Sequence, residues 1–175
     1  MLVRAIATCV FAFCAGVAGA AEMLESDFQV SYQYGGSQQQ LSEDTVPLLP
    51  GNSCYTWWIK LAEGSAPQSA EERLILPEAL ADWGDLATNP ADGVEISADN
   101  TTATSTFVPE MSADGWFSKG WCVAAGDPLG PHRIEVSIDG TPVDTFEFDV
   151  VQPEDYSWPA LHQPNPRERS VHDSW

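Results

Sequence analysis

The chain has 175 residues, and its 26 acidic side chains far outnumber its 7 basic ones, giving a formal net charge of −19. Hydrophobic residues make up 43% of the chain, so one domain with its own apolar core fits this length. The acidic surface repels phosphate groups, and we therefore exclude nucleic acid and anionic membranes as partners. The same charge favours solubility and attracts cations or basic proteins only as a diffuse field.

The first 20 residues have the pattern of a secretory signal peptide. Residues 1–4 carry one positive charge, residues 5–17 are uncharged and mostly apolar, and residues 18–20 read Ala-Gly-Ala. This order predicts cleavage between Ala20 and Ala21. The apolar run is too short for a membrane anchor. We therefore expect a soluble, extracytoplasmic protein, either periplasmic or secreted, with no membrane insertion after signal cleavage.

The next segment alternates with the two-residue period of a half-buried strand. Its apolar positions are Phe28, Val30, Tyr32 and Tyr34. Residues 35–40, two glycines and a polar run, end this strand, and the proline-containing residues 41–52 predict a loop.

Residues 53–61 predict a central strand, because both of its faces carry large side chains. The face expected in the core carries Tyr55, Trp57, Ile59 and Leu61. The opposite face carries Cys54, Thr56, Trp58 and Lys60.

Shorter elements follow in the middle of the chain. Residues 73–76 predict a strand, and residues 77–83 predict one helical turn with Pro77 at its first position. Further strands are predicted over residues 94–97, 103–108 and 116–125. In the last of these, Phe117, Trp121 and Val123 share one face.

The clearest prediction is a final hairpin around Asp139-Gly140. Its apolar rows are Ile134, Val136 and Ile138 on one strand and Phe146, Phe148 and Val150 on the other. A two-residue loop would pair even with odd positions and put the two rows on opposite faces. The pattern therefore favours a loop of three or five residues, with Gly140 at positive φ.

Residues 152–175 contain four prolines and no alternation, and they predict a flexible or loosely docked tail. Its aromatic residues, Tyr156, Trp158 and Trp175, either contact a partner or pack back on the domain. The predicted organisation is a signal peptide over 1–20, a sandwich domain over 21–151 and a tail over 152–175.

The sequence from 126 to 150 resembles the final hairpin of bacterial extracytoplasmic immunoglobulin-like domains. The resemblance is carried by Gly-Asp-Pro-Leu-Gly at 126–130, Asp139-Gly140 and Phe-Glu-Phe-Asp-Val at 146–150. With the strand pattern it implies an all-β fold, an antiparallel immunoglobulin-like β-sandwich of about seven strands with one helical turn. The chain departs from antibody domains because Gly120, not tyrosine, stands two residues before Cys122.

Two cysteines, Cys54 and Cys122, remain after signal cleavage, and in an oxidising compartment a lone pair predicts a disulfide. The bond would close a loop of roughly 70 residues, for which the chain-entropy model gives about 4 kcal/mol of stabilisation. We expect it to staple the two sheets. Both cysteines lie off the apolar faces of their strands, so either the bond lies near the exterior or a bulge turns it inward.

Three classes of function remain. The favoured one is a non-catalytic interaction or structural domain that binds a protein through a sheet edge, loops or the tail. An enzyme is disfavoured, because the chain lacks Gly-x-Ser-x-Gly, His-Glu-x-x-His and Cys-x-x-Cys. We assign no catalytic, cofactor or metal residue and expect His132 at the surface, while calcium binding by the acidic loops is left open.

The alternative is a carbohydrate-binding module that stacks sugars on exposed tryptophans. Alternation places Trp57 and Trp121 in the core and leaves Trp58 and Trp116 as the exposed pair. This alternative requires that Trp58 and Trp116 are not both buried. With Trp158 and Trp175 in the tail, they are the expected ligand or partner contacts.

Overall fold

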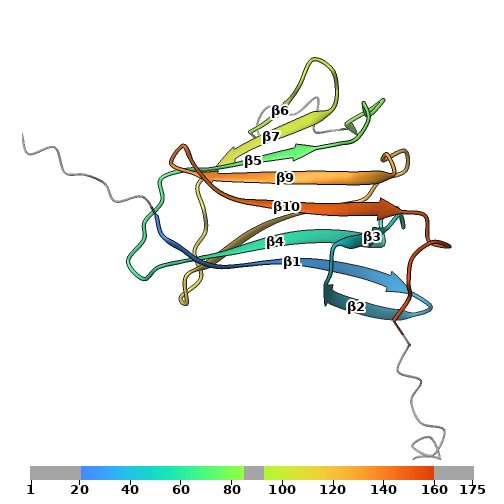
Figure 1. Ribbon diagram of the computed structural model, residues 1–175, viewed down its shortest axis with the longest axis horizontal. Helices are drawn as coiled ribbons and strands as arrows, with labels where there is room; N and C mark the ends of the chain where they lie inside the picture. The colour runs from blue at the N-terminus through green and yellow to red at the C-terminus, as the bar shows by residue number, and fades with distance from the viewer. Residues whose placement is uncertain (1–20, 85–92, 160–175) are drawn as a thin grey trace, which may run out of the picture.

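The computed structural model describes residues 21–84 and 93–159, and these form ten strands in two sheets packed face to face (Figure 1). The four-stranded sheet has the order β2 (Ser37–Ser42), β1 (Met23–Tyr34), β4 (Ser53–Leu61) and β8 (Trp116–Cys122). The six-stranded sheet has the order β3 (Thr45–Pro47), β10 (Thr141–Val151), β9 (Gly130–Ile138), β5 (Ala70–Ile75), β7 (Thr102–Phe107) and β6 (Val94–Ile96). Residues 1–20, for which a signal peptide is predicted, lie outside the described part of the chain.

The strand order is that of an immunoglobulin-like sandwich. In the larger sheet, β10, β9 and β5 lie side by side as strands G, F and C do in immunoglobulin domains, and β7 and β6 extend the sheet beyond β5. Since β6 precedes β7 in the chain, these two strands do not follow the order of C′ and C″ in variable-type domains. In the smaller sheet, β1, β4 and β8 take the places of strands A, B and E. All pairings are antiparallel except that of β3 with β10. The predicted all-β, immunoglobulin-like fold class is confirmed, with ten strands in place of about seven.

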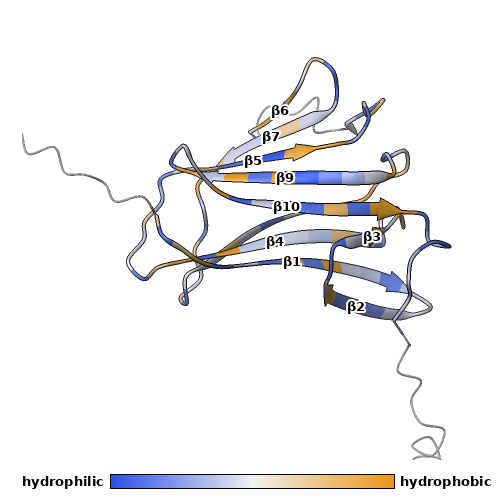
Figure 2. Cartoon of the chain, viewed as in Figure 1, coloured by the Kyte–Doolittle hydropathy of each residue, from blue (hydrophilic) through white to orange (hydrophobic). Residues whose placement is uncertain are grey.

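The predicted faces of the central strand are also confirmed. Along β4, buried and partly exposed residues alternate without interruption. The buried residues are Ser53, Tyr55, Trp57, Ile59 and Leu61. They pack against the apolar row of the final hairpin, and Figure 2 shows the matching alternation of hydrophobic and hydrophilic residues along β10.

The final hairpin has the right core but a different loop. Ile138 pairs with Thr141, so the loop holds two residues and the predicted odd loop is wrong. Asp139 and Gly140 both have positive φ, as a type I′ turn requires, which confirms the prediction for Gly140. A register shift between Pro142 and Asp144 then restores the parity. Beyond this bulge even positions pair with even positions, so both apolar rows reach one core.

Two strands and one turn differ from the predictions. The polar segment expected to end the first strand is β2, which pairs with β1 at the sheet edge, and the predicted loop contains β3. Neither strand was predicted, because neither carries a row of alternating apolar side chains. β2 lies at a sheet edge with one neighbouring strand, and β3 has only three residues. The helical turn predicted over 77–83 is absent there, where the chain forms bends instead. Backbone hydrogen bonds from Leu76 and Leu80 to residues 100 and 101 hold this segment.

The first residues after β10 pack on the domain. Trp158 stacks on Tyr34 with ring centroids 3.9 Å apart, and its indole N–H donates to the Pro153 carbonyl at 3.0 Å. Tyr156 is 5% exposed, lies edge-on to Tyr32 and donates a hydrogen bond to Glu43. Residues 152–159 are therefore held by aromatic pairs, so Tyr156 and Trp158 pack back on the domain, which is one of the two alternatives expected for them. Residues 160–175, including Trp175, lie outside the described residues.

Candidate functional site

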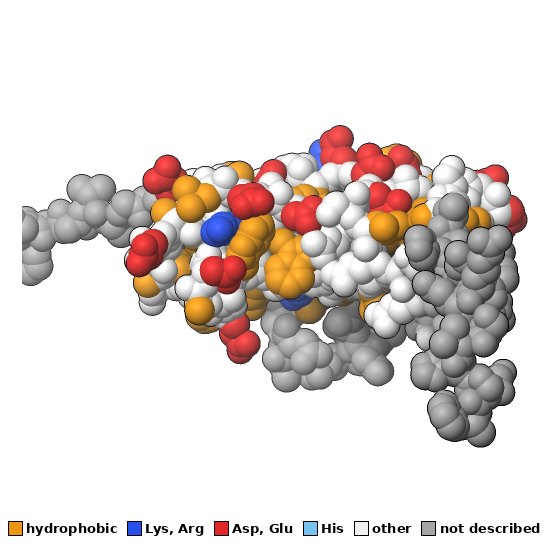
Figure 3. Space-filling view, turned by 90° about the horizontal axis from the view of Figure 1, so that it is seen from below, with side chains coloured by type: hydrophobic (Ala, Val, Ile, Leu, Met, Phe, Trp, Pro, Cys, Tyr) orange, Lys and Arg blue, Asp and Glu red, His pale blue; other side chains and the backbone are white. Residues whose placement is uncertain are grey.

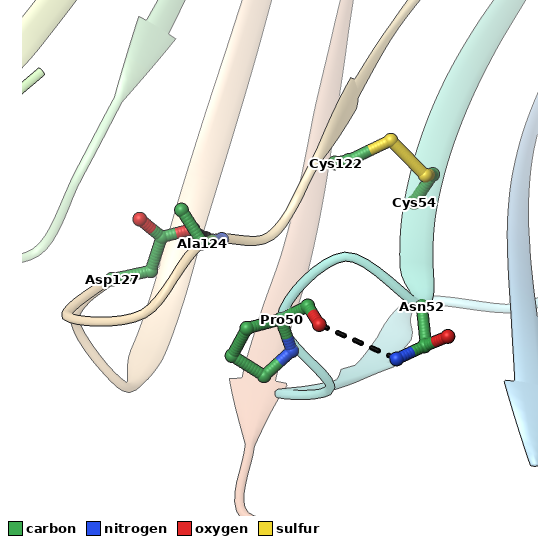
Figure 4. Close-up of a disulfide and its surroundings, with 6 residues drawn as sticks. All are labelled: Pro50, Asn52, Cys54, Cys122, Ala124 and Asp127. Carbon is green, nitrogen blue, oxygen red and sulfur yellow. Dashed lines mark hydrogen bonds between the residues drawn. A yellow bond between two sulfur atoms is a disulfide. The ribbon is translucent and has the colours of Figure 1, made fainter. Parts of the chain in front are cut away.

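The disulfide lies on the outer face of the smaller sheet. Cys54 on β4 and Cys122 on β8 stand directly opposite each other, with Cα atoms 3.8 Å apart (Figure 4). The bond therefore joins neighbouring strands of one sheet, and the prediction that it staples the two sheets is wrong. Both cysteines alternate with the core residues of their strands, so alternation keeps the bond on the outside.

Two side-chain hydrogen bonds join the two sheets across the core. Glu72 on β5 of the larger sheet is fully buried, and its two carboxylate oxygens accept hydrogen bonds from two tryptophans of the smaller sheet. Trp57 Nε1 donates to one oxygen, and Trp121 Nε1 donates to the other at 2.5 Å. The carboxylate thus gives both indole N–H groups an acceptor, that of the fully buried Trp57 and that of the partly buried Trp121.

Burial raises the pKa of the Glu72 carboxyl, although the two indole hydrogen bonds and the charge of Lys119 act to lower it. With no exposed surface, Glu72 has no access to a substrate, so we assign it a structural role. The sequence held one signal for it, because Glu72 interrupts the buried row of Ala70 and Leu74.

Trp58 and Trp116 meet in one open cleft on the outer face of the smaller sheet. The cleft measures about 610 Å³ and is lined by Glu25, Ser26, Asp27, Gln29, Trp58, Ser112, Asp114 and Trp116. Asp27 on β1 pairs with Trp58 on β4, and Lys60 pairs with Trp116 on β8, which places these side chains on one face. Both tryptophans are partly exposed. The condition set for the carbohydrate alternative is therefore met.

Polar side chains beside the tryptophans are held in place by hydrogen bonds. Asp27 Oδ2 accepts from Gln29 Nε2 at 2.7 Å and from Ser42 Oγ at 3.1 Å. Gln40 Nε2 donates to Gln29 Oε1 at 2.6 Å. The indole N–H of Trp58 is shielded from solvent and has no acceptor among the described residues. The face therefore presents ordered carboxylate and amide groups next to two rings.

A tight turn before β8 positions Trp116 and Asp114. Ser112 Oγ accepts a hydrogen bond from the Trp116 backbone N–H at 2.9 Å and donates one to Asp114 Oδ1 at 2.7 Å. The second of these bonds lowers the pKa of the Asp114 carboxyl, so it stays ionised at neutral pH. Gly115 has a φ of +87°, and a Cβ there would lie 2.8 Å from the Leu61 carbonyl oxygen. Only glycine fits this close approach.

One basic side chain, that of Lys60, lies against the Trp116 ring. Its Nζ lies 5.6 Å from the centroid of the Trp116 ring, a cation–π distance. Glu25 stands opposite Lys60 in the β1–β4 register. In the space-filling view of Figure 3, exposed hydrophobic side chains lie beside a basic one and are surrounded by acidic ones.

His132 is buried, and its prediction as a surface residue is wrong. It is 4% exposed, stacks on Phe148 with ring centroids 5.3 Å apart, and shares a hydrogen bond of 2.9 Å between Nδ1 and the Gly130 carbonyl. Burial lowers its pKa. Within residues 21–84 and 93–159, no three His, Cys, Asp or Glu side chains are grouped so that they could hold a metal ion. The same residues contain no helix of the length and apolarity needed to span a bilayer.

A family model described as PM0630 beta sandwich domain matches residues 26–151, which span both sheets. The chain belongs to this family. No curated protein matches it.

Two solved structures show low similarity to this member of the family. An immunoglobulin-like protein from Pseudomonas aeruginosa has 12% sequence identity and a TM-score of 0.47, with 76% of this chain and 99% of that chain covered. The alkylpurine DNA glycosylase AlkC from Pseudomonas fluorescens, bound to DNA containing an abasic site analog, has 11% identity and a TM-score of 0.32, with 72% and 30% covered.

Proposed function

We propose that this protein is a non-catalytic interaction domain that works outside the cytoplasm and binds a protein partner at the Trp58–Trp116 cleft. The observation that carries the proposal is the pair of partly exposed tryptophans in one cleft, set among ordered polar groups. Tryptophan is enriched among the residues that dominate binding energy at protein interfaces. The signal-peptide pattern of residues 1–20 supports the location.

Partner capture tests this proposal. The mature protein, immobilised, is exposed to the native extracytoplasmic fraction and compared with the double variant Trp58→Ala/Trp116→Ala. Val108→Ala/Leu129→Ala is the matched control, since it removes two apolar side chains that are 70% and 42% exposed elsewhere on the surface. We expect a specific protein to be retained by the wild type and the control and to be lost from the tryptophan variant. Retention by all three would place the interaction elsewhere and overturn the proposal.

A carbohydrate-binding module is the second candidate. It is supported by the same two rings, because apolar sugar faces stack on flat aromatic surfaces, and by the hydrogen-bonding groups of Asp27, Gln29 and Gln40 beside them. A glycan array tests it, with binding by the wild type and none by Trp58→Ala/Trp116→Ala as the expected result. Absence of any cleft-dependent glycan signal would remove this candidate and leave the protein partner.

A further inference from the structure

We infer that the Trp58–Trp116 cleft binds a cationic side chain, a lysine or arginine from a basic segment of a protein partner. This inference rests on the proposed function and adds the chemistry of the ligand. Three carboxylates, those of Glu25, Asp27 and Asp114, line the same cleft as the two indole rings, and of the described residues the one basic side chain at cation–π distance from either ring is Lys60, beside Trp116. A negatively charged rim around aromatic faces is complementary to a cation that approaches the rings.

The position of Lys60 is an independent observation for the same chemistry. Its ammonium lies 5.6 Å from the centre of the Trp116 ring, so this ring already holds one cation of the chain at cation–π distance. Lys60 is a residue of β4 with a flexible stem, and its head can leave the ring when another cation arrives. A guanidinium is the better competitor, because it is planar, stacks on aromatic faces and is more weakly hydrated than an ammonium.

The charge of the whole chain points to the same class of partner. At a net charge of −19, the protein attracts basic surfaces from a distance and repels acidic ones. The cleft adds fixed negative charges at one place to this diffuse attraction, because Asp27 is held by two hydrogen bonds and Asp114 by one. A neutral sugar would gain nothing from this charge, and we therefore commit to a basic protein segment.

Two peptides that differ only in charge form the test. The full mature protein is titrated with acetyl-Gly-Arg-Gly-amide and with the same peptide carrying citrulline, the neutral isostere of arginine. Binding is followed by the indole N–H signals of Trp58 and Trp116 in NMR spectra, assigned from the single alanine variants. We expect saturable shifts of both signals with the arginine peptide, weaker binding at higher salt, and affinity at least about 5-fold lower for citrulline.

Variants matched in net charge separate the cleft from the diffuse field. Glu25→Gln/Asp114→Asn removes two carboxylates of the cleft, and Glu147→Gln/Asp149→Asn removes two exposed ones on β10 of the other sheet. We expect the first pair to weaken arginine-peptide binding by about 5-fold or more and the second by less than about 2-fold. Lys60→Met removes the internal competitor and is expected to strengthen binding.

Each alternative outcome overturns the inference. Equal affinity for the citrulline peptide, or equal weakening by both carboxylate pairs, would show that no specific cation site exists. Shifts of the two indoles by a neutral oligosaccharide such as cellotetraose, with none by the arginine peptide, would assign the cleft to carbohydrate. Loss of partner capture in Trp58→Ala/Trp116→Ala, without binding of the arginine peptide, would overturn the ligand chemistry alone and leave the proposed function standing.

Discussion

The two faces of the smaller sheet use the same residue type in opposite ways. Strands β4 and β8 each place one tryptophan on the inner face and one on the outer face. The inner pair, Trp57 and Trp121, donates both indole N–H groups to Glu72 of the other sheet. The outer pair, Trp58 and Trp116, lines an open cleft, and the Trp58 N–H has no acceptor among the described residues.

The difference shows that the neighbouring layer, and not the residue type, decides the role of a tryptophan. On the inner face a second sheet supplies a carboxylate and apolar contacts, so the rings of Trp57 and Trp121 stabilise the fold. On the outer face the sheet meets solvent, so the rings stay accessible to a partner. The four expected effects below test this division, from the largest to the smallest.

Trp57→Ala should have the largest effect on stability. The side chain is fully buried, so its loss removes core packing, and Glu72 also loses one of its two donors. We expect the free energy of unfolding to fall by about 3–5 kcal/mol. Chemical denaturation followed by circular dichroism measures the change. A loss below about 1 kcal/mol would contradict the structural role of the inner pair.

Removal of the disulfide should follow closely, although the bond lies on the outer face. Its sequence separation is 68 residues, so Cys54→Ser should lower the free energy of unfolding by up to about 4 kcal/mol in the chain-entropy model. Cys122→Ser should have the same effect, and a reductant should destabilise the wild type alone. Different losses for the two single variants would show that the bond is not the common cause.

Glu72→Gln should lower the free energy of unfolding by about 1–3 kcal/mol, because an amide has only one oxygen to accept hydrogen bonds from the two indole N–H groups. It should also change the pH dependence. Since the folded-state pKa of Glu72 is raised above its ordinary value of 4.5, the folded protein binds its proton more tightly than the unfolded chain. This contribution to stability is present below pH 4.5 and is lost as the pH rises through the folded-state pKa.

The buried His132 makes stability depend on pH in the opposite direction. The pH profile of the wild type alone therefore does not isolate Glu72, and the Glu72→Gln variant is needed. Its pKa is lowered from 6.5, so its contribution is present above that pH and is lost as the pH falls through the folded-state pKa. Subtracting the pH profile of Glu72→Gln from that of the wild type isolates Glu72. A difference that is constant with pH would contradict the raised pKa.

Trp58→Ala and Trp116→Ala should have the smallest effect on stability, about 1 kcal/mol each, because both side chains are partly exposed. Their effect should appear in partner binding instead. Denaturation curves and partner capture, measured on the same preparations, separate the two readouts. If either variant lost as much stability as Trp57→Ala, the outer tryptophans would contribute to the core and the distinction between the inner and outer pairs would be wrong.

Local pattern was sufficient for much of the fold. Alternation predicted the strand over 53–61, the buried row around Trp57 and the outward direction of Trp58, because side chains of a strand alternate between its two faces. It also predicted the two apolar rows of the final hairpin and the positive φ of Gly140. The lone cysteine pair predicted the disulfide, but periodicity left open whether the bond lies outside or is turned inward, and the expected link between the two sheets is wrong.

Contacts between distant segments decided the rest. The bulge after Pro142 shifts the register by one residue, so that the apolar rows of β9 and β10 face the same core despite the two-residue turn. The strands β2 and β3 form because they pair with the edges of β1 and β10. The partners of Glu72 lie 15 and 49 residues away on the opposite sheet. The cleft likewise joins three strands and a turn. Periodicity predicts which face a residue occupies, but only the packing of sheets and the register of strands determine what that face meets.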